Sequence, residues 1–559
     1  MLDSSAFAGA DALPDLLRCD ICIIGTGPAG TTIARELSNT PLRVTVLESG
    51  GTERQKETDA LNEIESIGWP REMNQWLVRN RVVGGTSGTW GGRCAPFDEI
   101  DLEARDWVPY SGWPFKMDEL VPYFDRGAKH LGLGAGSAFS DDRVWAYIGH
   151  KPPKLDLDED KLLPMIWQIS HDPINWTDRV RFGRHLPADL GPNVTLVTNA
   201  TVVRINATES GTSVRSVEFA DASCRHWSLP TSAVVVCAGG IENARLLLAS
   251  DDVVAQGLGN QNDLVGRFLM DHPRAFVARF EVKQGRAAMN RFAVFKSRAA
   301  DGNRYHLGVR LSPAVQRSEQ LPNCAVWVFA YNSGPDDPPW DALKRFLTRE
   351  ANVRQDLRAI MMNSDLLFRG LKDYFILHRG IPHKCDGIAL EAMCEQLPNP
   401  HSRITLSDRR DPLGMRIPRI DWRVSEEEAR AMRRITELLL EQFSRMGLEP
   451  PVPEEWVRDG AMFPDTLRDI AHPIGTTRMA DDPACGVVDA QCQVHGVDGL
   501  FVAGSSVFPT AGHANPTQMI VAMAVRVADT LKERATASPK LRETPVTSVL
   551  GSTHPEPTR

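Results

Sequence analysis

Two short stretches near the C-terminus combine histidine with glycine, proline and threonine. The first reads AHPIGTTRM (471–479) and the second reads AGHANPTQM (511–519). An imidazole loses its proton near neutral pH, so a histidine held beside a reacting hydroxyl group can act as a general base. His472 and His513 are therefore the two candidates for such a role.

Each of these stretches also has a structural interpretation. Taken alone, His472 would be interpreted as a core histidine that is hydrogen-bonded to the backbone. Asn515 stands directly before Pro516 and the helical pattern QMIVAMAVRVADTL, so it is a candidate N-cap, with Pro516 at the first helical position. A side chain that caps a helix cannot fully satisfy a second partner. Capping by Asn515 would therefore compete with a role of the same side chain in binding a substrate.

The elements that would position these residues begin at the other end of the chain. CDICIIG (19–25) is an apolar run typical of a buried strand, and a glycine-rich turn with a helical pattern follows it. LRVTVLESGG (42–51) is a second strand, which ends at Glu48. Near the C-terminus, GLFVAGSSVFP (499–509) supplies a strand and a turn that would bring the histidine stretches to this unit.

The glycine-rich turn GTGPAG has the spacing of a dinucleotide-binding motif. Gly25, Gly27 and Gly30 form the pattern G-x-G-x-x-G between a strand and a helix, and Glu48 lies where a ribose-binding acid is expected. Such glycines let backbone amides approach a pyrophosphate at the helix N-terminus. A tight turn without a ligand is the competing interpretation, and the complete strand–helix–strand context argues against it.

Length and charge limit the class of protein. A chain of 559 residues is too long to fold around one simple hydrophobic core, so two or more domains are expected. A net charge of −9 offers no basic excess for nucleic acid. No apolar run reaches the roughly 18–20 residues of a membrane span, and the acidic N-terminus does not resemble a signal peptide. We expect a cytoplasmic protein, with export alongside a partner left open.

Six motifs occur in a fixed order along the chain. They are GTGPAG, LESGG, VVGGTSGTWGG, VVVCAGGIENARLLLAS, HPIGTTRM and GLFVAGSSVFPTAGHANPTQM. As a set they resemble the glucose–methanol–choline (GMC) flavoprotein oxidoreductases, in particular the pyranose-oxidase-like and bacterial sugar dehydrogenase branch. The resemblance implies FAD, a Rossmann-like α/β domain built from discontinuous segments, and an α+β substrate-binding domain over the flavin.

The resemblance also implies a division of the chain into alternating segments. The FAD-binding segments are 1–105, 196–275 and 461–535, the last of which also carries the catalytic residues. The substrate-binding segments are 106–195 and 276–460. Residues 536–559, rich in proline, threonine and serine, are expected to form a mobile tail.

Site residues follow from the resemblance position by position. The catalytic base of the family lies in a His-x-x-Gly-Thr stretch, which His472 matches, and a second polar residue corresponds to Asn515, 43 residues later. His472 is therefore favoured over His513. The positive end of the last helix would face the flavin and stabilise its reduced form. The implied cofactor-binding residues are Gly25, Gly27, Gly30, Glu48, Gly84, Gly85, Thr89, Trp90, Val203, Ala238, Ala503, Gly504, Pro516 and Thr517.

Two further residues bear on the cofactor and the domain boundary. In pyranose-oxidase-like relatives a histidine of the loop matching GGTSGTW is bonded to the flavin, and Thr89 stands at that position here, so we expect non-covalent FAD. His272, in FLMDHP, is interpreted as a structural residue near the domain crossing, with a site role as the alternative.

The expected reaction is FAD-dependent oxidation of a CH–OH group to a carbonyl, in a sugar, glycoside or polyol. Electrons would pass to a quinone, a dye or a partner protein rather than to O2, which makes a dehydrogenase the favoured form over an oxidase. The alternatives are oxidation of a non-sugar alcohol, a hydroxynitrile-lyase-type enzyme with structural FAD, and a flavoprotein without catalysis.

Overall fold

The structure is a computed structural model of the chain. It describes residues 1–7, 13, 17–134, 143–175, 178–298, 303–331, 342, 345, 353–362, 368, 372, 376–378, 387–464, 467 and 469–537. Of the segment 536–559, interpreted from sequence as a mobile tail, the first two residues belong to the last helix and the others lie outside the described residues. No helix in the described ranges is long and apolar enough to cross a bilayer.

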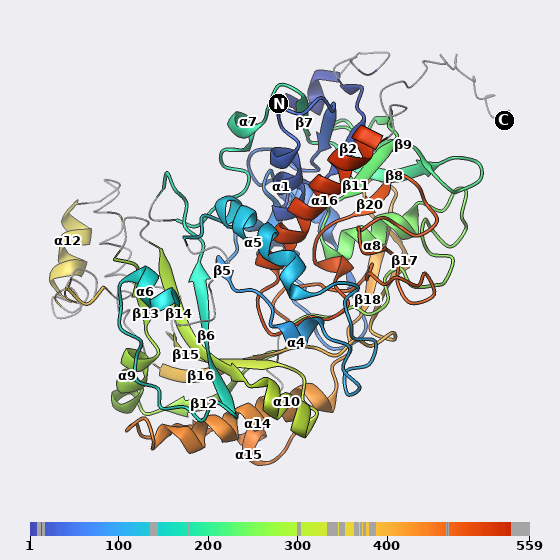
Figure 1. Ribbon diagram of the computed structural model, residues 1–559. Helices are drawn as coiled ribbons and strands as arrows, with labels where there is room; N and C mark the ends of the chain where they lie inside the picture. Colours follow the sequence, from blue (N-terminus) through green and yellow to red (C-terminus); the bar gives the residue numbers. More distant parts are fainter. Residues whose placement is uncertain are drawn as a thin grey trace.

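A six-stranded parallel sheet occupies the upper right of Figure 1. Its described strand pairs are all parallel. The central strands are short apolar runs in which every residue is buried, as expected for a parallel sheet that is covered on both faces. The strand order is β1 (Leu2–Asp3), β7 (Val194–Thr198), β3 (Val44–Leu47), β2 (Ile21–Ile24), β11 (Ala233–Val236) and β20 (Leu500–Val502). This confirms a Rossmann-like sheet assembled from discontinuous segments.

Helices from both ends of the chain pack around this sheet. α1 (Pro28–Glu36) contacts the long C-terminal helix α16 (Thr517–Ala537), which also contacts α5 (Met117–Leu131). Figure 1 shows α1 and α16 side by side. α8 (Gly240–Ala249), which directly follows β11, packs against β8 (Thr201–Ala207) instead. The first and last tenths of the chain are thus brought together.

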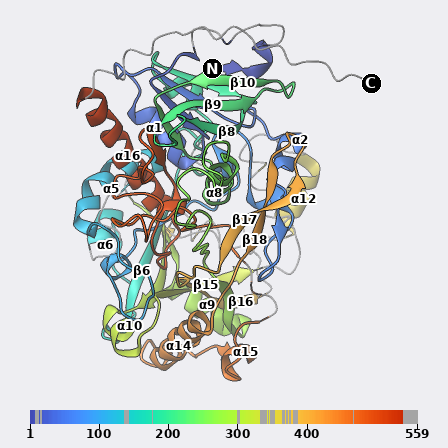
Figure 2. The same cartoon turned by 90° about the vertical axis from the view of Figure 1, so that its right-hand side faces the viewer.

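Two small sheets accompany the parallel sheet. β8 pairs antiparallel with β9 (Val214–Ala220), which pairs with β10 (His226–Pro230). The second sheet joins β17 (Arg403–Arg410), β18 (Arg416–Asp421) and β4 (Glu65–Ser66). β17 and β18 come from the segment assigned above to the substrate domain, yet both contact α8 of the nucleotide-binding part (Figure 2).

A second, eight-stranded sheet forms the lower left of Figure 1. Its described pairings are antiparallel. The order is β19 (Val452–Pro453), β12 (Arg274–Phe280), β16 (Gly387–Cys394), β15 (Cys324–Tyr331), β14 (Arg304–Leu311), β6 (Leu162–Ile169) and β5 (Arg93–Cys94), with β13 (Val294–Lys296) beside β14.

The two faces of this sheet serve different purposes. Helix α14 (Glu426–Phe443) covers one face, on which Val326 and Leu390 belong to its hydrophobic core. Side chains alternate along a strand. Trp327 and Glu391, which directly follow Val326 and Leu390 in the sequence, therefore lie on the opposite face. That face is turned toward the parallel sheet and forms part of the cavity described below.

The sequence of α14 explains its bounds. Ser425 is its N-cap, and the backbone N–H of Ser425 donates to Glu428 Oε2 at 2.7 Å, which completes a capping box. Gly447, at φ +68°, ends the segment after the last turn. α14 is therefore an amphipathic helix with a serine cap, and a glycine ends the turn that follows it.

The remaining described elements are short. The α-helices are α2 (Lys56–Asp59), α3 (Gln75–Val78), α4 (Glu99–Leu102), α6 (Arg143–Ile148), α7 (Leu186–Asp189), α9 (Val282–Arg291), α10 (Pro313–Glu319), α12 (Val353–Met361) and α15 (Glu455–Arg458). The 3₁₀ helices are η1 (Ser4–Phe7), η3 (Ala60–Asn62), η4 (Gly85–Gly88) and η6 (Ser505–Val507).

Candidate active site

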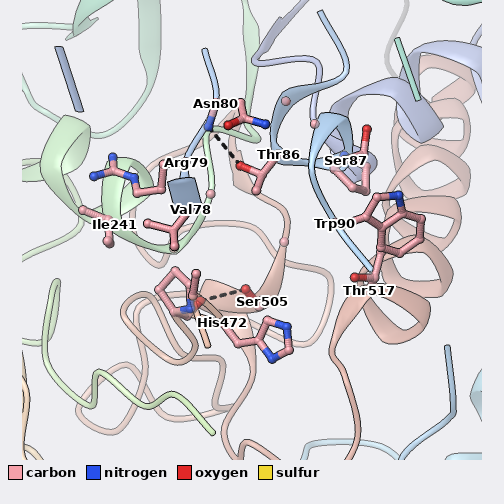
Figure 3. Close-up of a pocket in the computed structure, with 18 of the residues that line it drawn as sticks. Val78, Arg79, Asn80, Thr86, Ser87, Trp90, Ile241, His472, Ser505 and Thr517 are labelled. Carbon is pink, nitrogen blue, oxygen red and sulfur yellow. Dashed lines mark hydrogen bonds between the residues drawn. The ribbon is translucent and has the colours of Figure 1, made fainter. Parts of the chain in front are cut away.

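A cavity of about 590 Å³ lies at the carboxyl ends of the parallel strands, between that sheet and the antiparallel one. Ligands of open α/β sheets bind at this edge. Figure 3 shows two sides of the cavity: Asn80 and Thr86 of one loop lie opposite His472 and Ser505. The glycine turn after β2, the turns after β11 and β20, and the segment before α16 complete this part of the lining.

The three glycines of the predicted motif have three different environments. Gly25 adopts φ +95°, and a Cβ at this position would lie 2.8 Å from the carbonyl oxygen of Cys237. A Cβ at Gly30 would lie 1.9 Å from the carbonyl oxygen of Gly25, so α1 can pack this closely only with glycine there. Gly27 lines the cavity, and a Cβ there would meet no described atom within 4 Å. The open approach at Gly27 leaves room for a phosphate group.

The carboxylate of Glu48 hydrogen-bonds to the glycine turn and to the residues after β3. Its Oε2 accepts hydrogen bonds from Thr26 N at 2.9 Å and Thr26 Oγ1 at 2.5 Å, and its Oε1 accepts from Gly50 N at 2.9 Å. Burial raises the pKa of Glu48, although the bonds from Thr26 and Gly50 oppose this effect. Thr26 Oγ1 in turn accepts from the N–H of Gly84 at 3.0 Å, which positions the next loop.

The glycine-rich loop after α3 carries Thr89 and Trp90 to the cavity wall. The hydroxyl of Thr89 accepts a hydrogen bond from Asn80 Nδ2 at 2.9 Å. Trp90 Nε1 donates to the carbonyl of Val180 at 2.8 Å, so the indole is both a packing and a lining residue. Asn80 Oδ1 is buried without a hydrogen-bond partner in the described structure, and Asn80 lines the cavity.

Most of the other residues predicted to bind the cofactor also line the cavity. They are Gly85, Ala238, Ala503, Gly504, Pro516 and Thr517. Val203 is a correction: its neighbour Val202 lines the cavity, whereas Val203 lines a separate surface hollow. The reason is the period of two in strand β8, which turns consecutive side chains to opposite faces.

His472 lies at the far side of the cavity from the glycine-rich loop (Figure 3). Its backbone N–H donates to the carboxylate of Asp271 at 3.1–3.2 Å, and its Nδ1 lies 3.1 Å from His272 Nδ1. Burial and then the neighbouring His272 lower the pKa of His472 to about 3, although Asp271 opposes them. His472 is therefore a neutral imidazole at physiological pH and can accept a proton.

Asn515 reaches the same cavity from the segment before α16. The alternative interpretation, in which the side chain of Asn515 caps this helix, does not agree with the structure. α16 begins at Thr517, and the carbonyl of Pro516 accepts the first helical bond, from Ile520 N at 2.9 Å, so Pro516 precedes the first helical position. Asn515 Oδ1 is buried and has no hydrogen-bond partner among the described residues. A buried polar atom costs free energy unless a partner satisfies it, which points to a ligand.

His513, the competing histidine, is not among the residues that line the cavity. It is buried, with Nδ1 3.1 Å from Asp101 Oδ2 and 2.9 Å from Asn323 Nδ2. Burial disfavours its charge, but the carboxylates of Asp98 and Asp101 outweigh this and raise the pKa of His513. Its contacts describe a structural ion pair that joins the C-terminal loop to the segment around α4.

The wall opposite the parallel sheet comes from strands that the sequence motifs did not single out. Trp327 and Phe329 of β15, with Glu391 of β16, face the cavity. Arg274 Nε lies 3.2 Å from Glu391 Oε1, and Arg93 stacks on the Trp327 ring at 4.9 Å. Burial raises the pKa of Glu391, against the charge of Arg274. The single acid in the apolar run GIALEAMC was the only sequence signal for this wall.

These features together define a dinucleotide-binding α/β enzyme. The glycine turn opens at Gly27, the acid follows the second strand, and two buried polar atoms, Asn80 Oδ1 and Asn515 Oδ1, lack partners among the residues that the structure describes. The cavity volume lies within the usual range for small-molecule and cofactor sites, about 300–1,000 Å³. The residues present therefore fit a dinucleotide cofactor whose reactive end would lie near His472.

Comparison with known proteins supports the predicted resemblance. Residues 398–524 match the family model described as GMC oxidoreductase. The chain is 25% identical to paromamine 6'-oxidase of Streptomyces fradiae, over 95% of each chain. It is 24% identical to 2-methyl-1,2-propanediol dehydrogenase of Mycolicibacterium austroafricanum, over 94% of this chain and 98% of the relative. These matches confirm the resemblance to the GMC oxidoreductases that the sequence motifs predicted.

A solved structure supports the fold. Pyridoxine 4-oxidase from Mesorbium loti superposes with a TM-score of 0.56 at 18% identity, over 92% of this chain and 99% of that one.

The glycine turn gives a test that separates folding from cofactor binding. We expect Gly30→Ala to destabilise the fold by about 1–3 kcal/mol, because its Cβ would overlap the Gly25 carbonyl. Gly27→Ala should fold normally but retain FAD about tenfold less tightly, a change of about 1.4 kcal/mol. Thermal unfolding and flavin absorbance of the purified variants measure the two effects. Normal flavin binding by Gly27→Ala would place the phosphates elsewhere.

Proposed function

We propose that this protein oxidises a CH–OH group of a sugar, glycoside or polyol to a carbonyl, with FAD as its cofactor. The observation that carries the proposal is the position of His472 and Asn515, which line one cavity together with the dinucleotide turn. The relatives support it, since one is named for a diol and the other for oxidation at the 6' position of paromamine.

The chain supplies the proton chemistry of this reaction. His472, neutral at physiological pH, accepts the proton of the substrate hydroxyl. The side-chain amide of Asn515 binds the same oxygen and holds it beside the imidazole. FAD, when bound, supplies the two-electron acceptor for the hydride that leaves the carbon. Loss of one proton to His472 and one hydride converts the CH–OH group to C=O, so atoms and electrons balance.

The antiparallel wall supports a polyhydroxylated substrate. The aromatic rings of Trp327 and Phe329 offer apolar surface for C–H groups, and the adjacent Arg274–Glu391 pair offers charged hydrogen-bond partners for hydroxyl groups. An apolar alcohol would leave this charged pair without a polar partner. The combination favours a sugar or polyol over a simple aromatic or aliphatic alcohol.

Two finer features belong to the same proposal. Thr89 stands where a covalent flavin histidine occurs in some relatives, and its hydroxyl is occupied by Asn80, which supports non-covalent FAD. We further propose that electrons leave to a quinone, a dye or a partner protein, which would make the enzyme a dehydrogenase. The relative named as a dehydrogenase over nearly the whole chain supports this choice, and a relative named as an oxidase marks the alternative.

An anaerobic screen tests the reaction itself. Sugars, glycosides, polyols and simple alcohols are mixed separately with the purified flavoprotein, and bleaching of the flavin absorbance is followed. We expect at least one polyhydroxylated compound to bleach the flavin and simple alcohols to act poorly. Cleavage of a cyanohydrin with no bleaching by any alcohol would instead establish a lyase with structural FAD.

Replacement of His472 tests the assignment of the base. We expect His472→Ala to slow anaerobic flavin reduction roughly 10²–10⁴-fold, the usual contribution of a positioned acid–base group, with FAD content unchanged. The matched control is His513→Gln, which should lower thermal stability because it breaks a buried ion pair but leave flavin reduction per folded molecule near that of the wild type. The opposite pattern would assign the base to His513.

Reoxidation of the reduced flavin tests the acceptor. The flavin is reduced anaerobically with substrate, and air-saturated buffer or a soluble quinone is then added. We expect the quinone to restore the flavin absorbance clearly faster than air. Equal rates, with a stoichiometric amount of hydrogen peroxide, would show that the protein is an oxidase.

A further inference from the structure

A second histidine, His272, lies directly behind His472. It is completely buried just before β12, and its Nδ1 lies 3.1 Å from His472 Nδ1. Its Nε2 lies 3.2 Å from the carbonyl oxygen of Ala511 and 3.1 Å from that of Gly512. Both carbonyls belong to the loop that also carries Asn515. His272 therefore has a partner at each ring nitrogen, and the partners differ in chemical character.

The chemistry of these partners fixes the position of each proton. Carbonyl oxygens only accept hydrogen bonds, so His272 Nε2 carries a hydrogen and donates it. Burial lowers the pKa of His272, so the ring is neutral and its Nδ1 has a free lone pair. A contact between two nitrogens requires one hydrogen, which must then be on His472 Nδ1. Since His472 is also neutral, its Nε2 is left without a hydrogen.

From these hydrogen positions we propose that His272 is a positioning residue. It holds His472 in the tautomer whose Nε2 carries no hydrogen and is ready to accept the substrate proton. The inference rests on the proposed function only in its last clause, because the tautomer itself follows from the contacts. The carbonyls of Ala511 and Gly512 are the origin of the effect. The backbone of the loop that presents Asn515 thus also sets the proton-accepting atom of His472.

The surrounding charges agree with this arrangement in both protonation states of His472. Asp271 accepts the backbone N–H groups of His272 and His472 and forms an ion pair with Arg71 at 2.8 Å. When Nε2 of His472 takes up a proton, its Nδ1–H bond to His272 becomes a charge-assisted bond, which is stronger. The charged groups that act on the pair are Asp271, Arg274 and His513, with Arg71 and Asp469 around Asp271.

Two substitutions of similar size separate the contacts of His272. In His272→Asn, the amide oxygen lies near the place of the ring Nδ1 and can accept from His472 Nδ1–H. In His272→Gln, the longer amide reaches the place of Nε2 and can donate to the Ala511 and Gly512 carbonyls, but no acceptor faces His472. A residue needed only for packing would respond similarly to both substitutions.

The rate of anaerobic flavin reduction gives the first measurement. We expect His272→Asn to keep a rate within about tenfold of the wild type and His272→Gln to lose roughly 10²–10⁴-fold, the scale reported by acid–base groups and by wrong tautomers. FAD content and thermal unfolding serve as controls for both variants. Equal rates in the two folded variants would overturn the proposal.

The imidazole tautomer gives the second measurement, and it requires no substrate. Two-bond ¹H–¹⁵N correlations of protein labelled with ¹⁵N-histidine report which ring nitrogen carries hydrogen, and His472→Gln assigns the signal. We expect the Nδ1–H tautomer for His472 in the wild type and in His272→Asn, and the Nε2–H tautomer or a mixture in His272→Gln. An Nε2–H tautomer in the wild type would refute the proposal. The expected tautomers without any alcohol oxidation would leave the proposal standing and refute the proposed function.

Discussion

The parallel pairing of β11 with two distant strands is the constraint on which the site depends. β11 lies between β2 and β20, with Val235 opposite Ile23 on one side and Phe501 on the other. Because the three strands run in the same direction, their carboxyl ends meet at one edge, and hydrogen bonds continue this alignment past the strands. The glycine turn, the turn at Ala238 and the turn at Ala503 are therefore neighbours, although more than 470 residues separate the first strand from the last.

The second requirement is a wall that closes the cavity, and it depends on a different periodicity. Alternation along β15 and β16 places one set of side chains in the core beneath α14 and the other set against the cavity. The charged pair of Arg274 and Glu391 can therefore face a ligand while the same strands contribute to a hydrophobic core. His513 holds the C-terminal loop to the α4 segment through its ion pair with Asp101. This contact fixes the position of the loop whose carbonyl groups face His272.

The sequence predicted those parts of the protein whose signal is local. The strand, glycine turn and helix around Gly25 form one contiguous pattern, and His472 lies in a recognisable stretch. Errors arose where one residue of register matters: Val203 faces away while Val202 faces the cavity, and Asn515 precedes the helix by one position too many to cap it. The wall with Trp327 and Glu391 was missed because antiparallel pairing joins residues about 60 apart. The partners of His272 Nε2 are backbone carbonyls, which carry no residue-type signal at all.

The order of the strands in the parallel sheet also has a consequence for how the protein is made. During synthesis from the N-terminus, β2, β3, β7 and β11 are present once residue 236 has emerged, but β20 and α16 follow only from residue 500 onward. Until then one edge of β11 has unpaired backbone groups, and the apolar face of α1 lacks its partner helix. Contacts of such long sequence separation form slowly, so this edge stays open to pairing with other chains for longer than the edges of strands that are close in sequence. The cofactor site includes Ala503 and Thr517, so it is completed only after these late residues have been made.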